Sequence, residues 1–114
     1  MRRAMSEVFF SAQTATGVSR KLFMNGAKHT FQAYGTTSAG AGAATVVIQV
    51  SNVPVPGTGA TSGDWKDAGT ITLSALATTS TSDGFAVDAA WRWARARITA
   101  ISGTDATVSV AMGT

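Results

Sequence analysis

Alternation of two residue types over the end of the chain is the feature that most restricts its fold. Residues 91–101 alternate small or apolar side chains with Trp, Arg and Thr, and residues 106–112 alternate again. Successive side chains of a β-strand point to opposite faces, so this period of two predicts two strands. Residues 102–105 (Ser-Gly-Thr-Asp) have the composition of a turn, so the two runs together predict a β-hairpin.

The alternation divides the first run into two faces of different chemistry. The small and apolar face carries Ala94, Ala96, Ile98 and Ala100. The opposite face, the Trp/Arg face, carries Trp91, Trp93, Arg95, Arg97 and Thr99. Two arrangements are open: a partner covers the Trp/Arg face, or one or both Trp side chains fill the core while the alanines face outward.

Shorter segments of the same kind occupy the rest of the chain. Strands are predicted over residues 7–13, 20–24, 27–34, 44–51, 64–74 and 85–87. Asn25-Gly26 predicts a second hairpin, joining 20–24 to 27–34, and residues 14–19, 36–43 and 52–63 have the composition of loops. No segment has helical periodicity. These patterns predict an all-β antiparallel β-sandwich of seven or eight short strands, jelly-roll or Ig-like.

Length and composition favour one small domain. Residues 7–114 are expected to form a single β-sandwich, preceded by a flexible basic arm at residues 1–6. Ala, Thr, Gly and Ser make up 61 of the 114 residues, charged residues only 13%, and Cys is absent. The lack of Cys excludes disulfides and thiolate zinc sites. A surface so poor in charge favours a protein covered by neighbours, the alternative being an exposed sheet rich in Thr and Ser.

The sequence predicts no enzyme, metal site or cofactor. The single histidine, His29, cannot build a histidine metal cluster or a Ser-His-Asp triad, and we expect it on a strand, half-exposed. The Asp residues lie in or beside turns, where they cap backbone amides, and no spacing selects a catalytic pair. Asp64 and Asp67 lack the spacing of an EF-hand, and Gly40-Ala-Gly42 lacks the Lys and the helix of a phosphate loop.

Charge and hydropathy argue against nucleic acid and membranes as partners. The net charge is +3, and the Trp/Arg face gives only a fragment of the basic and aromatic pattern that nucleic-acid binding requires. No stretch approaches the ~20 apolar residues of a membrane span. Glu7 interrupts the apolar run behind the basic start, so no signal peptide is expected.

The Trp/Arg face is the strongest candidate for a binding site. Trp and Arg dominate the energetics of protein interfaces, and Arg over Trp adds a cation–π contact. The candidate partner-binding residues are Trp91, Trp93, Arg95 and Arg97, together with Arg2 and Arg3 of the basic arm.

Residues 44–114 resemble small structural proteins of tailed-bacteriophage virions, of the capsid decoration (cement) type. The likeness lies in Trp65 followed by Gly-Thr-Ile-Thr-Leu, in Asp83-Gly84-Phe85, and in the alternating run that begins at Trp91. It implies a β-sandwich present in many copies on the capsid surface, made in the host cytoplasm. Its partners would be the major capsid protein and further copies of the chain, as dimers or trimers. Here the N-terminal arm is short, which departs from some members.

Two functions are therefore expected from the sequence. The first is a non-enzymatic decoration protein that holds neighbouring capsomers together. The second is a carbohydrate- or receptor-binding module of a phage tail or fibre, in which Trp65, Trp91, Trp93 and Tyr34 stack on sugars beside Asp64 and Asp67.

Overall fold

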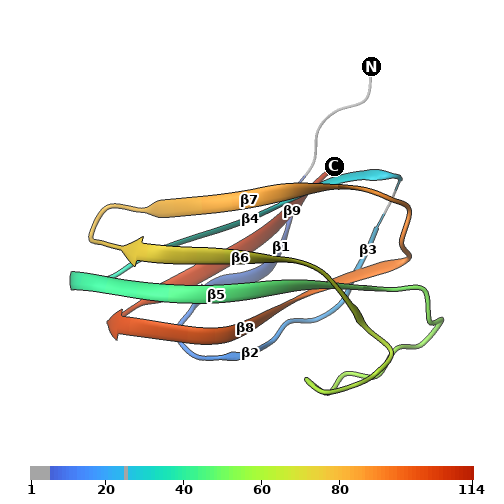
Figure 1. Cartoon of the computed structure of the whole chain (residues 1–114), viewed down its shortest axis with the longest axis horizontal. Helices are drawn as coiled ribbons and strands as arrows, with labels where there is room; N and C mark the ends of the chain where they lie inside the picture. The colour runs from blue at the N-terminus through green and yellow to red at the C-terminus, as the bar shows by residue number, and fades with distance from the viewer. Residues whose placement is uncertain (1–5, 25) are drawn as a thin grey trace.

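The computed structural model describes residues 6–24 and 26–114 as two antiparallel β-sheets packed face to face (Figure 1). The strands are β1 (Ser6–Gln13), β2 (Gly17–Val18), β3 (Leu22–Phe23), β4 (Lys28–Thr36), β5 (Ala39–Ser51), β6 (Lys66–Leu76), β7 (Thr81–Asp88), β8 (Trp93–Thr104) and β9 (Thr107–Gly113). The predicted all-β sandwich is confirmed. Ser6, which we expected in the arm, is the first residue of β1.

The order of the strands is that of a jelly roll. The first sheet has the order β1-β9-β4-β7, and the second has the order β2-β8-β5-β6, with β3 also paired to β8. Since β2 and β3 pair with successive parts of β8, they act as one interrupted strand. The first half of the chain thus pairs in reverse order with the second half, as one long ribbon rolled on itself. An Ig-like sandwich orders its strands differently.

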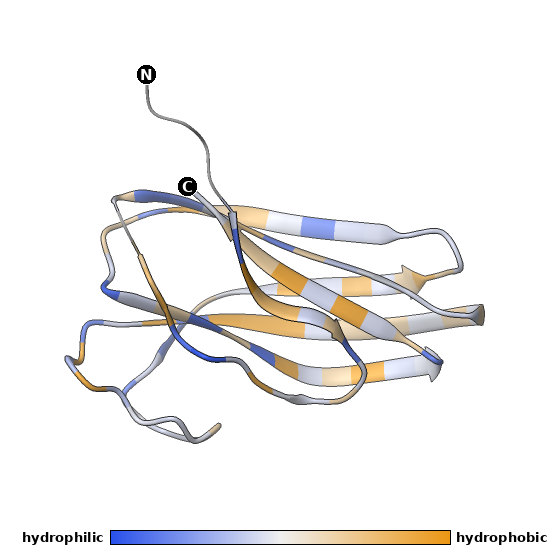
Figure 2. Cartoon of the chain, turned by 180° about the vertical axis from the view of Figure 1, so that it is seen from behind, coloured by the Kyte–Doolittle hydropathy of each residue, from blue (hydrophilic) through white to orange (hydrophobic). Residues whose placement is uncertain are grey.

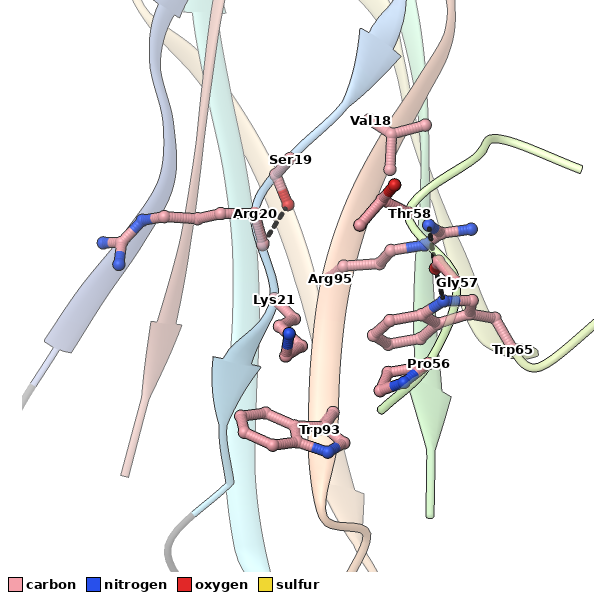
Figure 3. Close-up of a pocket in the computed structure, with 10 residues that line it drawn as sticks. All are labelled: Val18, Ser19, Arg20, Lys21, Pro56, Gly57, Thr58, Trp65, Trp93 and Arg95. Carbon is pink, nitrogen blue, oxygen red and sulfur yellow. Dashed lines mark hydrogen bonds between the residues drawn. The ribbon is translucent and has the colours of Figure 1, made fainter. Parts of the chain in front are cut away.

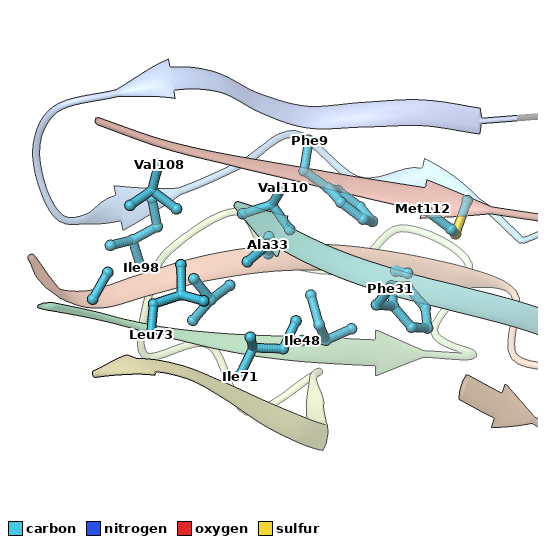
Figure 4. Packing of buried hydrophobic residues seen from close by; sticks show 14 of the residues in the cluster. Phe9, Phe31, Ala33, Ile48, Ile71, Leu73, Ile98, Val108, Val110 and Met112 are labelled. Atoms are coloured by element: carbon cyan, nitrogen blue, oxygen red, sulfur yellow. The ribbon is translucent and has the colours of Figure 1, made fainter. Parts of the chain in front are cut away.

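The predicted C-terminal hairpin is wrong in its pairing. Both strands exist, but β8 lies in the second sheet and β9 in the first. The connection at Asp105, whose φ is 48°, carries the chain across the sandwich. As a result, Ile98 and Val108 meet through the core, as Figure 4 shows, instead of lying side by side in one sheet. Alternation determines which face of a strand is buried, but it does not determine the neighbouring strand.

The hairpin predicted at Asn25-Gly26 is also absent. β3 pairs with β8, whereas β4 pairs with β7 and β9, so this connection too passes from one sheet to the other. Asn25 lies outside the described residues, and Gly26 has a φ of 101°, which suits glycine. A second turn prediction fails nearby, because Gly17 and Val18 pair with β8 instead of forming a loop.

The core lies between the sheets and is built by both. Along the strands, hydrophobic residues alternate with polar ones (Figure 2), and the inward set interdigitates (Figure 4). Its largest fully buried apolar members are Phe31, Ile48, Ile71, Leu73, Leu76, Ile98 and Met112, and Phe9 is nearly as buried. His29 lies on the buried face of β4 and is 2% exposed, so the half-exposed position expected for it is wrong.

The segment expected to be a flexible loop, residues 36–43, is mostly strand. β4 runs to Thr36 and β5 begins at Ala39. Glycine is required here because β5 and β8 approach closely: a Cβ on Gly42 would lie 2.4 Å from the carbonyl oxygen of Ser102 and 2.8 Å from Thr37 Cγ2. The small residues that look like a linker in the sequence therefore allow close packing of the backbone.

Gly42→Ala should destabilise the protein by about 1–3 kcal/mol, because the added methyl group meets a backbone oxygen that cannot move without disturbing the sheet. Gly63→Ala is the matched control, since nothing lies within 4 Å of its Cβ position. We expect that control to stay within about 0.5 kcal/mol of the parent. Urea denaturation measures both, and equal stability of the two variants would contradict the close approach of β5 and β8.

Candidate functional site

The Trp/Arg face lies on the outside of the second sheet. Ala94 and Ala96 are fully buried and Ile98 is 1% exposed, so the small face of β8 turns into the core. The arrangement in which Trp side chains fill the centre of the sandwich is therefore excluded for Trp93. Trp91, which precedes β8, is half-buried and packs against the edge of the core.

The predicted face ends at a β-bulge. The register shifts between the pairs Thr45–Ala100 and Val46–Ile98, which leaves Thr99 as an extra residue in β8. Beyond the bulge the phase of the alternation changes. Ala100 is exposed, against prediction, and Ile101 packs against the core in its place.

Arg95 is an internal residue, not a free contact residue. The loop at residues 52–65 folds over the outer face of the sheet and leaves Arg95 only 1% exposed. Its Nη2 donates to the carbonyl oxygen of Gly59 at 3.1 Å, and Nη1 donates to that of Gly57 at 3.5 Å. The guanidinium carbon lies 4.4 Å from the centroid of the Trp65 ring. The chain itself thus supplies the cover for this part of the Trp/Arg face.

A polar relay connects Arg95 to a carboxylate. Arg95 Nε donates to Gln49 Oε1 at 2.8 Å, and Gln49 Nε2 donates to Asp67 Oδ1 at 2.8 Å. No carboxylate touches the guanidinium directly within the described residues. Burial, and then the nearby charge of Arg97, lower the pKa of Arg95. The charge of Arg95 is therefore stabilised by backbone carbonyl dipoles, by the face of the Trp65 ring and by the Asp67 carboxylate, from which the side-chain amide of Gln49 separates it.

The covering loop is held by its own hydrogen bonds. Trp65 Nε1 donates to the carbonyl oxygen of Gly57 at 2.8 Å, and the Gly57 amide donates to Asp64 Oδ2 at 2.9 Å. Ser51 Oγ donates to the Asp64 carbonyl oxygen at 2.7 Å. Neither Gln49 nor the structural role of Trp65 was predicted from the sequence. Gln49 gave a signal, because it is the one polar residue within the apolar run from Val46 to Val50.

Four side chains beside this loop form the Trp93 surface: Lys21, Phe23, Arg92 and Trp93. Phe23 is 54% exposed and meets the Trp93 ring edge-on, with 5.8 Å between ring centroids. Lys21 Nζ and the Arg92 guanidinium carbon lie 5.1 Å and 5.7 Å from the Trp93 ring centroid. The result is an exposed Phe23 ring on a half-buried Trp93 ring, flanked by two cations.

A cavity of about 440 Å³ adjoins the Trp93 surface. The segment from Val18 to Lys21 forms one wall and the covering loop at Pro56–Thr58 forms the other, with Trp93 and Arg95 between them (Figure 3). Of the predicted contact residues, Arg97 is half-buried on the same row of β8, and Arg2 and Arg3 lie outside the described residues. The structure therefore brings Trp93 and Arg97 to the outer face, encloses Arg95, and adds Lys21, Phe23 and Arg92.

Within the described residues, no group of three or more His, Asp or Glu side chains could hold a metal ion. The same part of the chain has no helix of the length and apolarity needed to cross a membrane. Comparisons with protein-family models, curated proteins and solved structures each give no match.

Proposed function

We propose that this chain is a non-enzymatic virion structural protein, a capsid decoration protein that binds neighbouring capsomers through the Trp93 surface. The observation that carries the proposal is the exposed Phe23 ring packed on Trp93 between Lys21 and Arg92. Aromatic and Arg side chains at the centre of an interface supply most of its binding energy, and the cations select an acidic partner. The resemblance of the sequence to phage decoration proteins is the reason for proposing the capsid as the partner.

Rigidity of the site supports an adhesive role. Trp93 stands on β8, which is paired with β5 on one side and with β2 and β3 on the other, and the covering loop beside it is tied to Arg95 and Trp65. A preformed surface loses little conformational entropy on binding. The unpaired edges of the two sheets, at β1 and β7 in the first and at β2, β3 and β6 in the second, are further places where copies of the chain could associate in the proposed dimer or trimer.

The carbohydrate-binding alternative has less support from the geometry. Sugars stack on open aromatic faces, but Trp93 already has Lys21 and Arg92 near its ring, and Trp65 has the Arg95 guanidinium on its face. Tyr34 is 38% exposed but stands on β4, in the other sheet. The three aromatic residues therefore do not form one open platform.

Phe23→Ser should weaken attachment to capsids by at least about tenfold, because it removes an exposed aromatic anchor without opening the core. Tyr34→Ser is the matched control: it removes an exposed aromatic residue from the opposite sheet and should bind like the parent. Co-sedimentation of each purified protein with capsids lacking the chain measures attachment. Equal binding by parent and Phe23→Ser would contradict the role of the Trp93 surface.

A further inference from the structure

A second cavity, of about 220 Å³, continues the first one along β8. Val18 lines both cavities. Every second residue of β8 contributes to their floors, Trp93 and Arg95 to the first cavity and Arg97 and Thr99 to the second. Val18 lies at the end of the first cavity in Figure 3, above Arg95 and away from Trp93. We name the two adjoining cavities together the β8 groove. Its floor is Trp93, Arg95, Arg97 and Thr99, and its walls are residues 16–21 and residues 56–60.

Positive charge predominates in the β8 groove. No Asp or Glu lines either cavity, whereas Lys21 and Arg97 do and the enclosed Arg95 lies between them. Arg20 also lines the first cavity, but its guanidinium points away from it (Figure 3) and donates to the carbonyl oxygen of Val8. Arg97 is half-buried and has no hydrogen bond or ion pair with any described residue. It also lies close enough to Arg95 to lower the pKa of that guanidinium, which means that the two cations repel each other. A bound anionic group between or beside them would relieve this repulsion.

The spacing of the floor matches an extended polypeptide. Residues two apart in a strand recur about every 7 Å, so Trp93 and Arg97, on either side of the enclosed Arg95, lie about two such repeats apart, and Thr99 follows at the bulge. An extended segment laid along the row presents every second side chain at the same interval. Carboxylates at alternate positions would reach the cations, and an apolar residue at one end would reach Phe23 on the Trp93 surface.

We infer that the β8 groove binds an extended acidic segment of a partner polypeptide, with carboxylates on Arg97 and Lys21 and an apolar side chain against Phe23. This inference rests on the proposed function only for the identity of the partner as a capsid protein. Single-stranded nucleic acid fits less well. Its binding proteins combine cations with aromatic faces on which bases stack, and here the rings of Trp93 and Trp65 already carry cations.

The test uses the whole chain and a synthetic peptide in which Glu and Thr alternate over about eight residues, with Phe at one end. Titration calorimetry at low ionic strength should show binding that falls as salt rises. Arg97→Gln should weaken the affinity by at least about tenfold. Lys28→Gln is the matched control, because it removes one exposed cation from the first sheet, and it should stay within about twofold of the parent.

The inference would be overturned by no binding of the peptide, by equal weakening in both variants, or by equal binding of a peptide with Lys in place of Glu. Tighter binding of a short oligothymidylate than of the acidic peptide would overturn it in favour of nucleic acid. The outcome is separable from the capsid proposal. If the chain binds the peptide but is absent from particles, the groove inference stands and the capsid proposal is contradicted. If the chain is present in particles but does not bind the peptide, only the capsid proposal stands.

Discussion

Arg95→Ala is expected to lower the free energy of unfolding by about 2–4 kcal/mol. The substitution leaves the carbonyl oxygens of Gly57 and Gly59 and Oε1 of Gln49 without their donor, in a site that is 1% exposed. It also opens a space beneath the Trp65 ring. Buried acceptors that lose a donor retain their full desolvation cost. The expected loss of stability is therefore large although Arg95 lies on the outer face of its sheet.

Arg97→Ala is the matched control for this prediction, because it removes the next guanidinium of the same row. With no hydrogen bond to any described residue, Arg97 should change stability by less than about 0.5 kcal/mol. Urea denaturation of both variants gives the comparison, provided that the free energy of unfolding falls with urea concentration at the same slope in both. If Arg95→Ala were as mild as Arg97→Ala, Arg95 would instead be the open contact residue that the alternation alone suggested.

Phe31→Ala should be the most destabilising substitution considered, at about 3–5 kcal/mol. Phe31 is 1% exposed and packs between Phe9 and Phe85, at centroid distances of 6.3 Å and 5.5 Å. Removing its ring leaves a cavity in the core between the sheets, beside Phe9 and Phe85.

Phe23→Ala controls for the loss of a phenyl ring as such. Because Phe23 is 54% exposed, its removal should cost less than about 1 kcal/mol. Thermal unfolding followed by circular dichroism separates the two variants. If the Phe31→Ala and Phe23→Ala proteins unfolded at the same temperature, the packing of the sandwich core would be contradicted.

The sequence predicted the faces of strands better than their partners. The alternation at Val46, Ile48 and Val50 and at Ile71 and Leu73 identified residues that are all at most 1% exposed. Pairing was different: both predicted hairpins are crossings between the sheets. Local turn composition is the same for a hairpin and for a crossing, and the choice between them depends on which distant strands are available.

The candidate site was only partly predictable for a similar reason. The row of Trp93, Arg95 and Arg97 follows from a period of two, and of the two arrangements that the sequence left open the structure has the one in which the alanines turn inward. The enclosure of Arg95 depends on Gly57 and Gly59, which lie in a loop about 36 residues away in sequence and give no periodic signal. Phe23 and Lys21 come to Trp93 only because β3 pairs with β8.

Because the covering loop encloses Arg95, the surface open to a partner is smaller than the whole Trp/Arg face. We expect it to be correspondingly more specific. The Trp93 surface and the β8 groove combine aromatic area with unpaired positive charge, and no acidic residue lines the groove. Such a site discriminates by charge as well as by shape, since a basic partner is repelled. We therefore expect decoration of the capsid to weaken as salt rises, as peptide binding should.

The central proposal, that the chain is a capsid decoration protein, is tested most directly by quantitative mass spectrometry of purified particles of the phage proposed to encode it. The quantity is the number of copies relative to the major capsid protein. A decoration protein predicts a ratio near one or a fixed simple fraction of it. A handful of copies per particle would contradict the decoration role in favour of a tail or fibre component, and absence from the particles would contradict a role in the virion.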